Sequence, residues 1–349
     1  MSLATFTEAL HAFHITDSDV SESSLRNSFS SSLTTSSSCS SVGATLKMVK
    51  KQVQYSLVDA FTDTPFKGNP AAVCMLEEER GEEWMQSVAR EFNAPASAFL
   101  KPIPPPSLEG NQEDPVPKYH LRWFTPIAEI QPCGHGTLAA SHFLFTSGLV
   151  RTDRIEFHTK AGLLTAKRVD SFQQSDDTSG SSKDKAEHFS IELDFPTIPV
   201  TQCDSTDIPS VPRTLNGAPV INIRTTSHGF PIMELSSGKA VVDIQPQFDE
   251  IQNSSGKGLI ITGHADHDSE FDFITRFFCP KLGVNEDPVC GMANCALAPY
   301  WSENLGKRDL VAYMASSRGG RLDLHVEEKT ERVLIRGKAV TIMLGYLLV

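Results

Sequence analysis

Two cysteines, each followed directly by a glycine, are the residues of this chain best suited to do chemistry. Cys133-Gly134 and Cys290-Gly291 each precede an alanine-rich stretch that is expected to be helical. The first N–H groups of a helix have no partner within it and carry the positive end of its dipole. We therefore expect each turn to bind an anion and to hold a thiol whose pKa lies below the free value of about 8.5.

The two Cys-Gly turns belong to an internal repeat. Each copy has the order arginine, aromatic residue, phenylalanine, any residue, proline, glutamate, Cys-Gly and a helix of small residues. The copies read Arg122-Trp123-Phe124-Thr125-Pro126, Glu129, Cys133-Gly134 and Arg276-Phe277-Phe278-Cys279-Pro280, Glu286, Cys290-Gly291. A duplicated strand–loop–helix unit predicts two similar lobes related by a pseudo-twofold axis, with the turns facing each other across a cleft.

Groups on opposite faces of one carbon atom can remove a proton from it and return one. Two opposed helix starts also suit a small carboxylate or an enolate. The residues alone therefore favour an epimerisation, a racemisation or a double-bond isomerisation. If the thiols act, one thiolate abstracts the proton and the other thiol delivers one; otherwise the cysteines are small buried residues at tight turns.

The elements that must position these turns are mostly strands. Helices are predicted over residues 82–92, 136–145 and 295–302, and strands over 53–61, 119–124, 155–159, 163–168, 188–195, 220–225, 232–235, 259–262, 271–278 and 333–348. Many strands with few helices favour an α+β fold over a doubly wound sheet.

Composition and charge narrow the class of protein. The chain has 349 residues and a formal net charge of −12, which argues against nucleic acid or an anionic membrane as its partner. It has no apolar run of 18 residues that would span a membrane. Its seven cysteines are an odd number and widely spaced, so we expect reduced thiols and a cytoplasmic location.

The chain is predicted to divide into four parts. Residues 1–51 form a serine-rich extension that we expect to be disordered, residues 52–169 an N-terminal lobe, residues 170–188 a flexible linker and residues 189–349 a C-terminal lobe. Whether the last strand returns to the N-terminal lobe is left open. The extension could alternatively direct the chain to a plastid or a mitochondrion, although its acidic residues are unusual for a transit peptide.

Several segments resemble the PhzF family of phenazine biosynthesis-like isomerases. They are Asp59 to Val73 with its Lys67-Gly68-Asn69-Pro70, Ala89-Arg90-Glu91-Phe92-Asn93, Cys133-Gly134-His135-Gly136-Thr137 and Asn285-Glu286-Asp287-Pro288-Val289. The resemblance implies a diaminopimelate-epimerase-like fold, with two pseudo-symmetric lobes that each wrap a sheet around a central helix. It also implies isomerase or epimerase chemistry on a small carboxylate-bearing substrate, without a cofactor, and a homodimer.

The resemblance also names candidate site residues. His135 and Asp287 match the family's histidine and aspartate, and Cys133 and Cys290 stand where related diaminopimelate epimerases carry their catalytic thiols, so these four are the candidate catalytic residues. The candidate substrate-binding residues are Gly134, Gly136, Gly291, Met292, Ala96 and Ser97. His135 could instead be a buried histidine bonded to the backbone, and Asp287 a helix N-cap. No metal site is predicted.

Two positions depart from the family pattern. Ala96 stands where the family has its general acid/base glutamate, and Met292 stands where it has a serine. Alanine cannot accept a proton, and the loss of a general base typically lowers a rate by two to four powers of ten. The alternative is therefore a catalytically impaired relative that binds a ligand or a partner through the same cleft.

Overall fold

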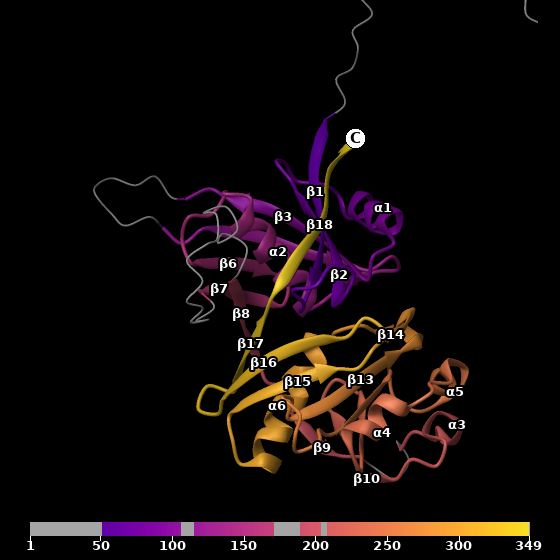
Figure 1. Ribbon diagram of the computed structural model, residues 1–349. Helices are drawn as coiled ribbons and strands as arrows, with labels where there is room; N and C mark the ends of the chain where they lie inside the picture. Colours follow the sequence, from indigo (N-terminus) through magenta and orange to yellow (C-terminus); the bar gives the residue numbers. More distant parts are fainter. Residues whose placement is uncertain (1–50, 106–114, 171–188, 204–207, 349) are drawn as a thin grey trace, which may run out of the picture. The chain divides into compact units, whose positions relative to one another are not determined.

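The computed structural model of the chain describes residues 51–105, 115–170, 189–203 and 208–348, all of which belong to one compact unit (Figure 1). The serine-rich extension, apart from Lys51, and most of the predicted linker lie outside the described residues. Within the described part, no helix is long and apolar enough to cross a membrane.

The first half of this unit begins with a strand and ends with the strand that joins it to the second half. Its elements are β1 (Gln52–Ala60), β2 (Asn69–Met75), α1 (Glu82–Phe92), β3 (Ala96–Ile103), β4 (Lys118–Phe124), β5 (Glu129–Ile130), α2 (Gly134–Thr146), β6 (Arg154–Thr159), β7 (Gly162–Asp170) and β8 (Phe189–Pro196).

The second half has the same mixture of strands with few long helices. Its elements are β9 (Val200–Gln202), α3 (Pro212–Leu215), β10 (Val220–Thr226), β11 (Pro231–Leu235), α4 (Gly238–Asp243), α5 (Phe248–Asn253), β12 (Leu259–His264), β13 (Phe273–Cys279), a 3-10 turn (Pro280–Leu282), β14 (Val284–Asp287), α6 (Gly291–Leu305), β15 (Asp309–Met314), β16 (Gly320–Glu327), β17 (Arg332–Gly337) and β18 (Ala339–Leu348). The predicted α+β class is confirmed.

Strand pairing follows the same pattern in both halves. Strands β1, β2, β3, β4, β6, β7 and β8 pair in this order as antiparallel, parallel, antiparallel, parallel, antiparallel and antiparallel neighbours. Strands β10, β11, β12, β13, β15, β16 and β17 repeat these directions one by one. The short strands β5 and β14 add to β4 and β13. The repeat in the sequence is therefore a repeat of topology.

Each half contains one long buried helix after its short strand. All residues from Gly134 to Phe145 of α2 are buried, and α6 is buried over most of its length. Because both helices are rich in alanine and other small residues on all sides, sheet strands can approach them from several directions. The largest hydrophobic cluster contains residues of both helices.

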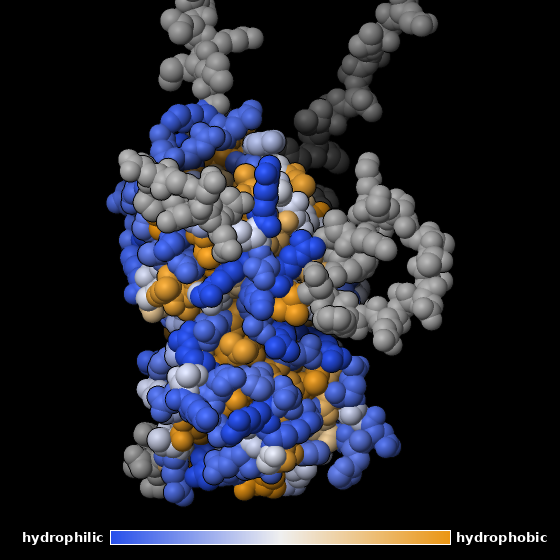
Figure 2. Space-filling view, turned by 90° about the vertical axis from the view of Figure 1, so that its left-hand side faces the viewer, coloured by the Kyte–Doolittle hydropathy of each residue, from blue (hydrophilic) through white to orange (hydrophobic). Residues whose placement is uncertain are grey.

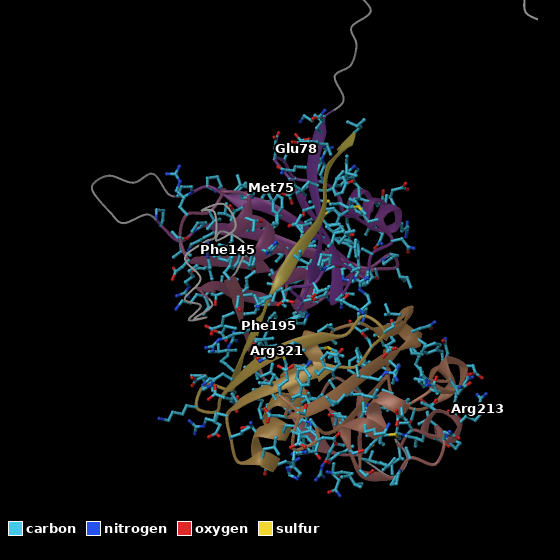
Figure 3. All side chains as sticks on the ribbon, in the orientation of Figure 1. Met75, Glu78, Phe145, Phe195, Arg213 and Arg321 are labelled. Carbon is cyan, nitrogen blue, oxygen red and sulfur yellow. The ribbon has the colours of Figure 1, made fainter. Side chains whose placement is uncertain are left out.

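Strands β8 and β18 connect the two halves. β8 pairs with β7 on one side and with β17 on the other, and β18 pairs with β1 along nearly its whole length (Figure 1; Figure 3 labels Phe195 on β8). The boundaries of the lobes stay a prediction, since β8 has partners in both.

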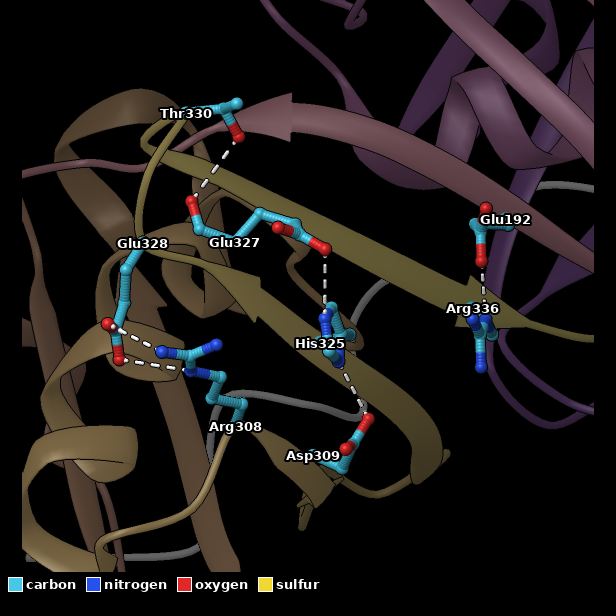
Figure 4. A network of polar contacts seen from close by, with 8 residues as sticks. All are labelled: Glu192, Arg308, Asp309, His325, Glu327, Glu328, Thr330 and Arg336. Atoms are coloured by element: carbon cyan, nitrogen blue, oxygen red, sulfur yellow. Dashed lines mark hydrogen bonds and ion pairs between the residues drawn. The ribbon is translucent and has the colours of Figure 1, made fainter.

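Exposed or partly exposed ion pairs lie on or next to β8, β15, β16 and β17. Arg336 bonds to Glu192 across the β17–β8 pair, Arg308 bonds to Glu328, and His325 lies between Asp309 and Glu327 (Figure 4). The hydrogen bond to Asp309 raises the pKa of His325. Exposed pairs of this kind contribute up to about 1 kcal/mol each, so the apolar core dominates stability. Hydrophilic side chains also predominate on the face in Figure 2.

Two predicted elements differ from the structure by more than one or two terminal residues. The helix predicted over residues 295–302 runs from Gly291 to Leu305, because burial outweighs the low helix propensity of its first turn. The strand predicted over residues 333–348 is two strands that meet at Lys338, where the chain passes from β8 as partner to β1. The helix predicted over residues 82–92 is confirmed at both ends.

Candidate active site

A cavity of about 600 Å³ lies where the starts of α2 and α6 meet. It is lined by seven of the ten predicted site residues, namely Cys133, Gly134, His135, Asp287, Cys290, Gly291 and Met292. Its other walls are mostly apolar.

The two helix starts touch through their glycines. A Cβ atom added to Gly134 would lie 3.1 Å from the Cα of Gly291, and one added to Gly291 would lie 3.2 Å from the Cα of Gly134. Glycine thus allows the two backbones to approach at this point. Among the described residues, the N–H groups of Gly134, His135, Gly291 and Met292 have no hydrogen-bond partner. Together they can bind an anion.

On the α2 side, a thiol and an imidazole form one couple. The Sγ atom of Cys133 lies 3.6 Å from Nδ1 of His135, and the Nε2 atom of His135 is buried without a partner among the described residues. Burial raises the pKa of Cys133 to about 12 and lowers the pKa of His135 to about 4. At neutral pH the couple is therefore a thiol and a neutral imidazole, whose free nitrogen can hydrogen-bond to a ligand.

On the α6 side, a carboxylate and a thiol form the second couple. Burial raises the pKa of Asp287 to about 6, although hydrogen bonds from Cys290 and Asn69 act in the opposite direction. Burial, and then the charge of Asp287, raise the pKa of Cys290 well above its usual value. The carboxyl group of Asp287 therefore changes charge close to neutral pH.

Asn69 holds this carboxylate from the other half of the chain. Its Nδ2 atom donates to Oδ1 of Asp287 at 2.7 Å and to the carbonyl oxygen of Val289 at 2.9 Å. The side chain is fully buried at the start of β2. Asn69 therefore fixes the orientation of Asp287 and favours its ionised form.

Replacing Asn69 with leucine should raise the pKa of Asp287 further. A carboxyl group whose pKa is higher in the folded than in the unfolded state favours folding as pH falls through the folded pKa. In the parent protein this gain begins below about pH 6, and in Asn69→Leu it should begin at a higher pH. Thermal unfolding temperatures measured between pH 4 and 8 give the pH midpoint of this stability gain. The variant Asn285→Leu, at an exposed position, is the control. An unchanged midpoint in Asn69→Leu would contradict the role of Asn69.

In each half, an arginine and a glutamate form the same bidentate ion pair, here called a fork. It joins β4 to β5 in the first half and β13 to β14 in the second. Arg122 binds both carboxylate oxygens of Glu129 at 2.8 and 2.7 Å, and Arg276 binds both oxygens of Glu286 at 2.7 and 3.0 Å. Each guanidinium also lies over a phenylalanine ring, at 5.1 Å for Phe124 and 5.0 Å for Phe278. The glutamates of the repeat are therefore bound to arginines.

Three predicted binding residues do not line the cavity. Ala96 is fully buried at the start of β3, opposite Ala71 of β2. The next residue, Ser97, is also fully buried, and its hydroxyl has no hydrogen-bond partner among the residues that the structure describes. Gly136 packs inward, since a Cβ there would lie 2.8 Å from Cδ1 of Trp123. The structure therefore brings Pro95, rather than Ala96, to the cavity wall.

Two further expectations change. The thiol pKa values are raised rather than lowered, because burial outweighs the helix dipole. Asp287 is not a helix N-cap; Cys290 is, with its Sγ atom accepting from the N–H of Ala293 at 3.4 Å. Cys279 is a third thiol in the cavity. Cys279 is part of the internal repeat, and Asn69 is part of the segment from Asp59 to Val73 that resembles the family. Neither pattern indicated that these two residues lie at the site.

Comparisons with known proteins show what the chain is similar to. The model of the phenazine biosynthesis-like protein family (PhzC-PhzF) matches residues 58–345. An uncharacterized isomerase of Halalkalibacterium halodurans is 37% identical over 84% of this chain and 97% of its own, and the phenazine biosynthesis-like domain-containing protein 2 of Mus musculus is 34% identical over 83% and 97%.

Solved structures show the same similarity. A PhzF family protein of Enterococcus faecalis has a TM-score of 0.68 and 33% identity, over 86% of this chain and all of its own. A hydroxyproline epimerase from Agrobacterium vitis shares the fold alone, with a TM-score of 0.51 and 13% identity over 86% and 92% of the two chains.

Proposed function

The chain belongs to the phenazine biosynthesis-like family, and on that premise we propose that it is an isomerase that moves a proton on a small carboxylate-bearing molecule without a cofactor. The observation that carries the proposal is the pair of acid–base couples beside the two touching helix starts. Asp287 at the end of β14 and Cys290 precede the start of α6, whereas Cys133 and His135 lie at the start of α2.

The helix starts are proposed to bind the substrate carboxylate. Four N–H groups that have no partner within the described part of the chain, and the buried Nε2 atom of His135, belong to residues of the cavity wall. Removing a proton from the adjacent carbon places negative charge on the carboxylate as an enolate. Donors that are already oriented stabilise this charge without having to reorganise.

Asp287 is the proposed base. Its pKa of about 6 leaves it ionised at neutral pH while keeping it a useful proton acceptor. Both thiols have raised pKa values and are protonated at neutral pH, so neither is a preformed thiolate. The Cys290 thiol, which is hydrogen-bonded to Asp287, can pass the substrate proton on to that carboxylate. The Cys133 thiol then gives its proton to the substrate from the α2 side and is left as a thiolate beside His135, while Asp287 is left protonated. The net charge of the site is therefore unchanged, and proton exchange with solvent restores the starting state.

A second candidate function is ligand or partner binding without catalysis. Ala96 supplies no acid–base group, it lies outside the cavity wall, and Met292 adds a bulky apolar side chain to that wall. In this case the cavity would bind a carboxylate, but no carbon-bound hydrogen of the ligand would exchange with solvent.

Solvent deuterium incorporation separates the two functions. The protein is incubated in D₂O with a panel of amino acids and cyclohexadienyl carboxylates, and mass spectrometry records a gain of one mass unit. We expect exchange with at least one compound, and a loss of exchange in His135→Gln but not in Ser97→Ala. No exchange with any compound, together with unchanged ligand binding in Cys290→Ala, would refute the catalytic proposal.

A homodimer is part of the same proposal. Apolar side chains on β18 are largely exposed, at 68% for Leu344 and 60% for both Tyr346 and Leu348, and a second copy would cover them. Light scattering of the purified protein measures the mass directly. The cytoplasmic location stays a prediction.

A further inference from the structure

The cavity runs from a buried floor to an exposed, basic mouth. Its floor is formed by buried residues such as Cys133, His135 and Cys290, whereas His228, Lys257 and Lys281 also line it and are exposed. The proposed proton transfer uses only the floor. The basic groups at the mouth therefore need another explanation.

The mouth carries positive charge without a neutralising carboxylate. The ammonium group of Lys281 donates to the backbone carbonyls of Ser254 and Gly256, which fix its position but leave its charge uncompensated. The stem of Lys257 packs beside Gly229. In the described part of the chain, neither lysine forms an ion pair with an acidic side chain. Glu129 lines the cavity too, but it already binds Arg122 and Lys160.

Apolar side chains form the wall of the same cavity. Phe230 and Phe277 are buried and pack edge to face, with ring centroids 5.3 Å apart. Ile127 and Leu282 also line the cavity and remain 61% and 49% exposed. A ligand that reaches from floor to mouth would therefore be apolar in its middle and anionic at both ends.

We propose that the ligand of this cavity is a dicarboxylic acid with an apolar middle. One carboxylate lies at the starts of α2 and α6, where the chemistry occurs, and the second lies between Lys257 and Lys281 at the mouth. The inference rests on the proposed function, because it takes the floor as the site of the reacting carboxylate. The two lysines would then determine which acids are accepted.

Binding of two matched series of acids tests this inference. Calorimetry compares straight-chain monocarboxylic acids of six to ten carbons with the α,ω-dicarboxylic acids of the same length. At the best length we expect the diacid to bind about fivefold more tightly, which is what two exposed charge pairs can supply. The double variant Lys257→Gln/Lys281→Gln should lose this preference and bind the monoacid as before. Lys239→Gln, which removes an exposed lysine that pairs with Asp243 on α4, is the control.

Each outcome decides a separate point. If monoacids bind and diacids gain nothing at any length, or if the lysine variant keeps the diacid preference, the inference is wrong and the proposed function stands. If no acid of either series binds, both the anion site at the floor and this inference fail. Deuterium exchange, which is measured separately, decides whether the floor is catalytic.

Discussion

Asp287→Asn should slow the reaction strongly and make the protein more stable at neutral pH. The amide keeps the size of the side chain and can still accept the hydrogen bond from Asn69, but it cannot take up a proton. Loss of a general base lowers a rate by about two to four powers of ten. Deuterium exchange into the best compound of the panel should fall by that factor.

The stability gain has a separate physical cause. The pKa of Asp287 is raised from 3.8 to about 6, so its ionised form is disfavoured in the folded protein. In the parent protein, stability should therefore rise as pH falls from about 6 toward 4, where only the folded state binds this proton. The asparagine side chain has no ionised form whose burial costs free energy. We therefore expect Asp287→Asn to add about 1–3 kcal/mol to the free energy of unfolding at pH 8.

Urea unfolding at pH 5 and pH 8 measures this difference, and the exposed Asp266→Asn is the matched control. A variant that is less stable than the parent at pH 8, with the same pH dependence, would show that the Asp287 carboxylate contributes to folding rather than opposing it. Full exchange activity in Asp287→Asn would remove it from the mechanism.

Arg276→Met should destabilise the protein far more than the equivalent Arg122→Met. Arg276 binds both oxygens of Glu286 and donates to the carbonyl oxygen of Ile244, and its side chain is only 9% exposed. Without it, a partly buried carboxylate and a carbonyl lose their partner. Removing one member of a buried ion pair costs about 3–5 kcal/mol.

Arg122 is the internal control that the duplication supplies. Its side chain is 26% exposed, and Glu129 would keep Lys160 as a partner. We therefore expect Arg122→Met to cost about 1 kcal/mol. Unfolding midpoints in urea measure both variants, and equal losses would mean that burial does not distinguish the two forks. Because Glu286 precedes Asp287 on β14, Arg276→Met should also reduce deuterium exchange.

The sequence by itself determined the features that depend on local order. The repeat of arginine, glutamate and Cys-Gly predicted two equivalent halves, and the strand pairing of the two halves has the same directions. The periodicity of residues 82–92 fixed α1 at both ends. Short stretches of sequence also predicted a helix after each Cys-Gly pair, because local backbone preferences need no distant partner, although the second predicted helix began four residues after the observed start at Gly291.

Only the tertiary structure decided the chemistry of those positions. Desolvation depends on what covers a group, so both thiols have raised pKa values although each stands at a helix start. Asn69 bonds to Asp287 from 218 residues away. Pro95 reaches the cavity while its neighbour Ala96 does not. Such facts arise from contacts between elements that are distant in the sequence, and no local pattern contains them.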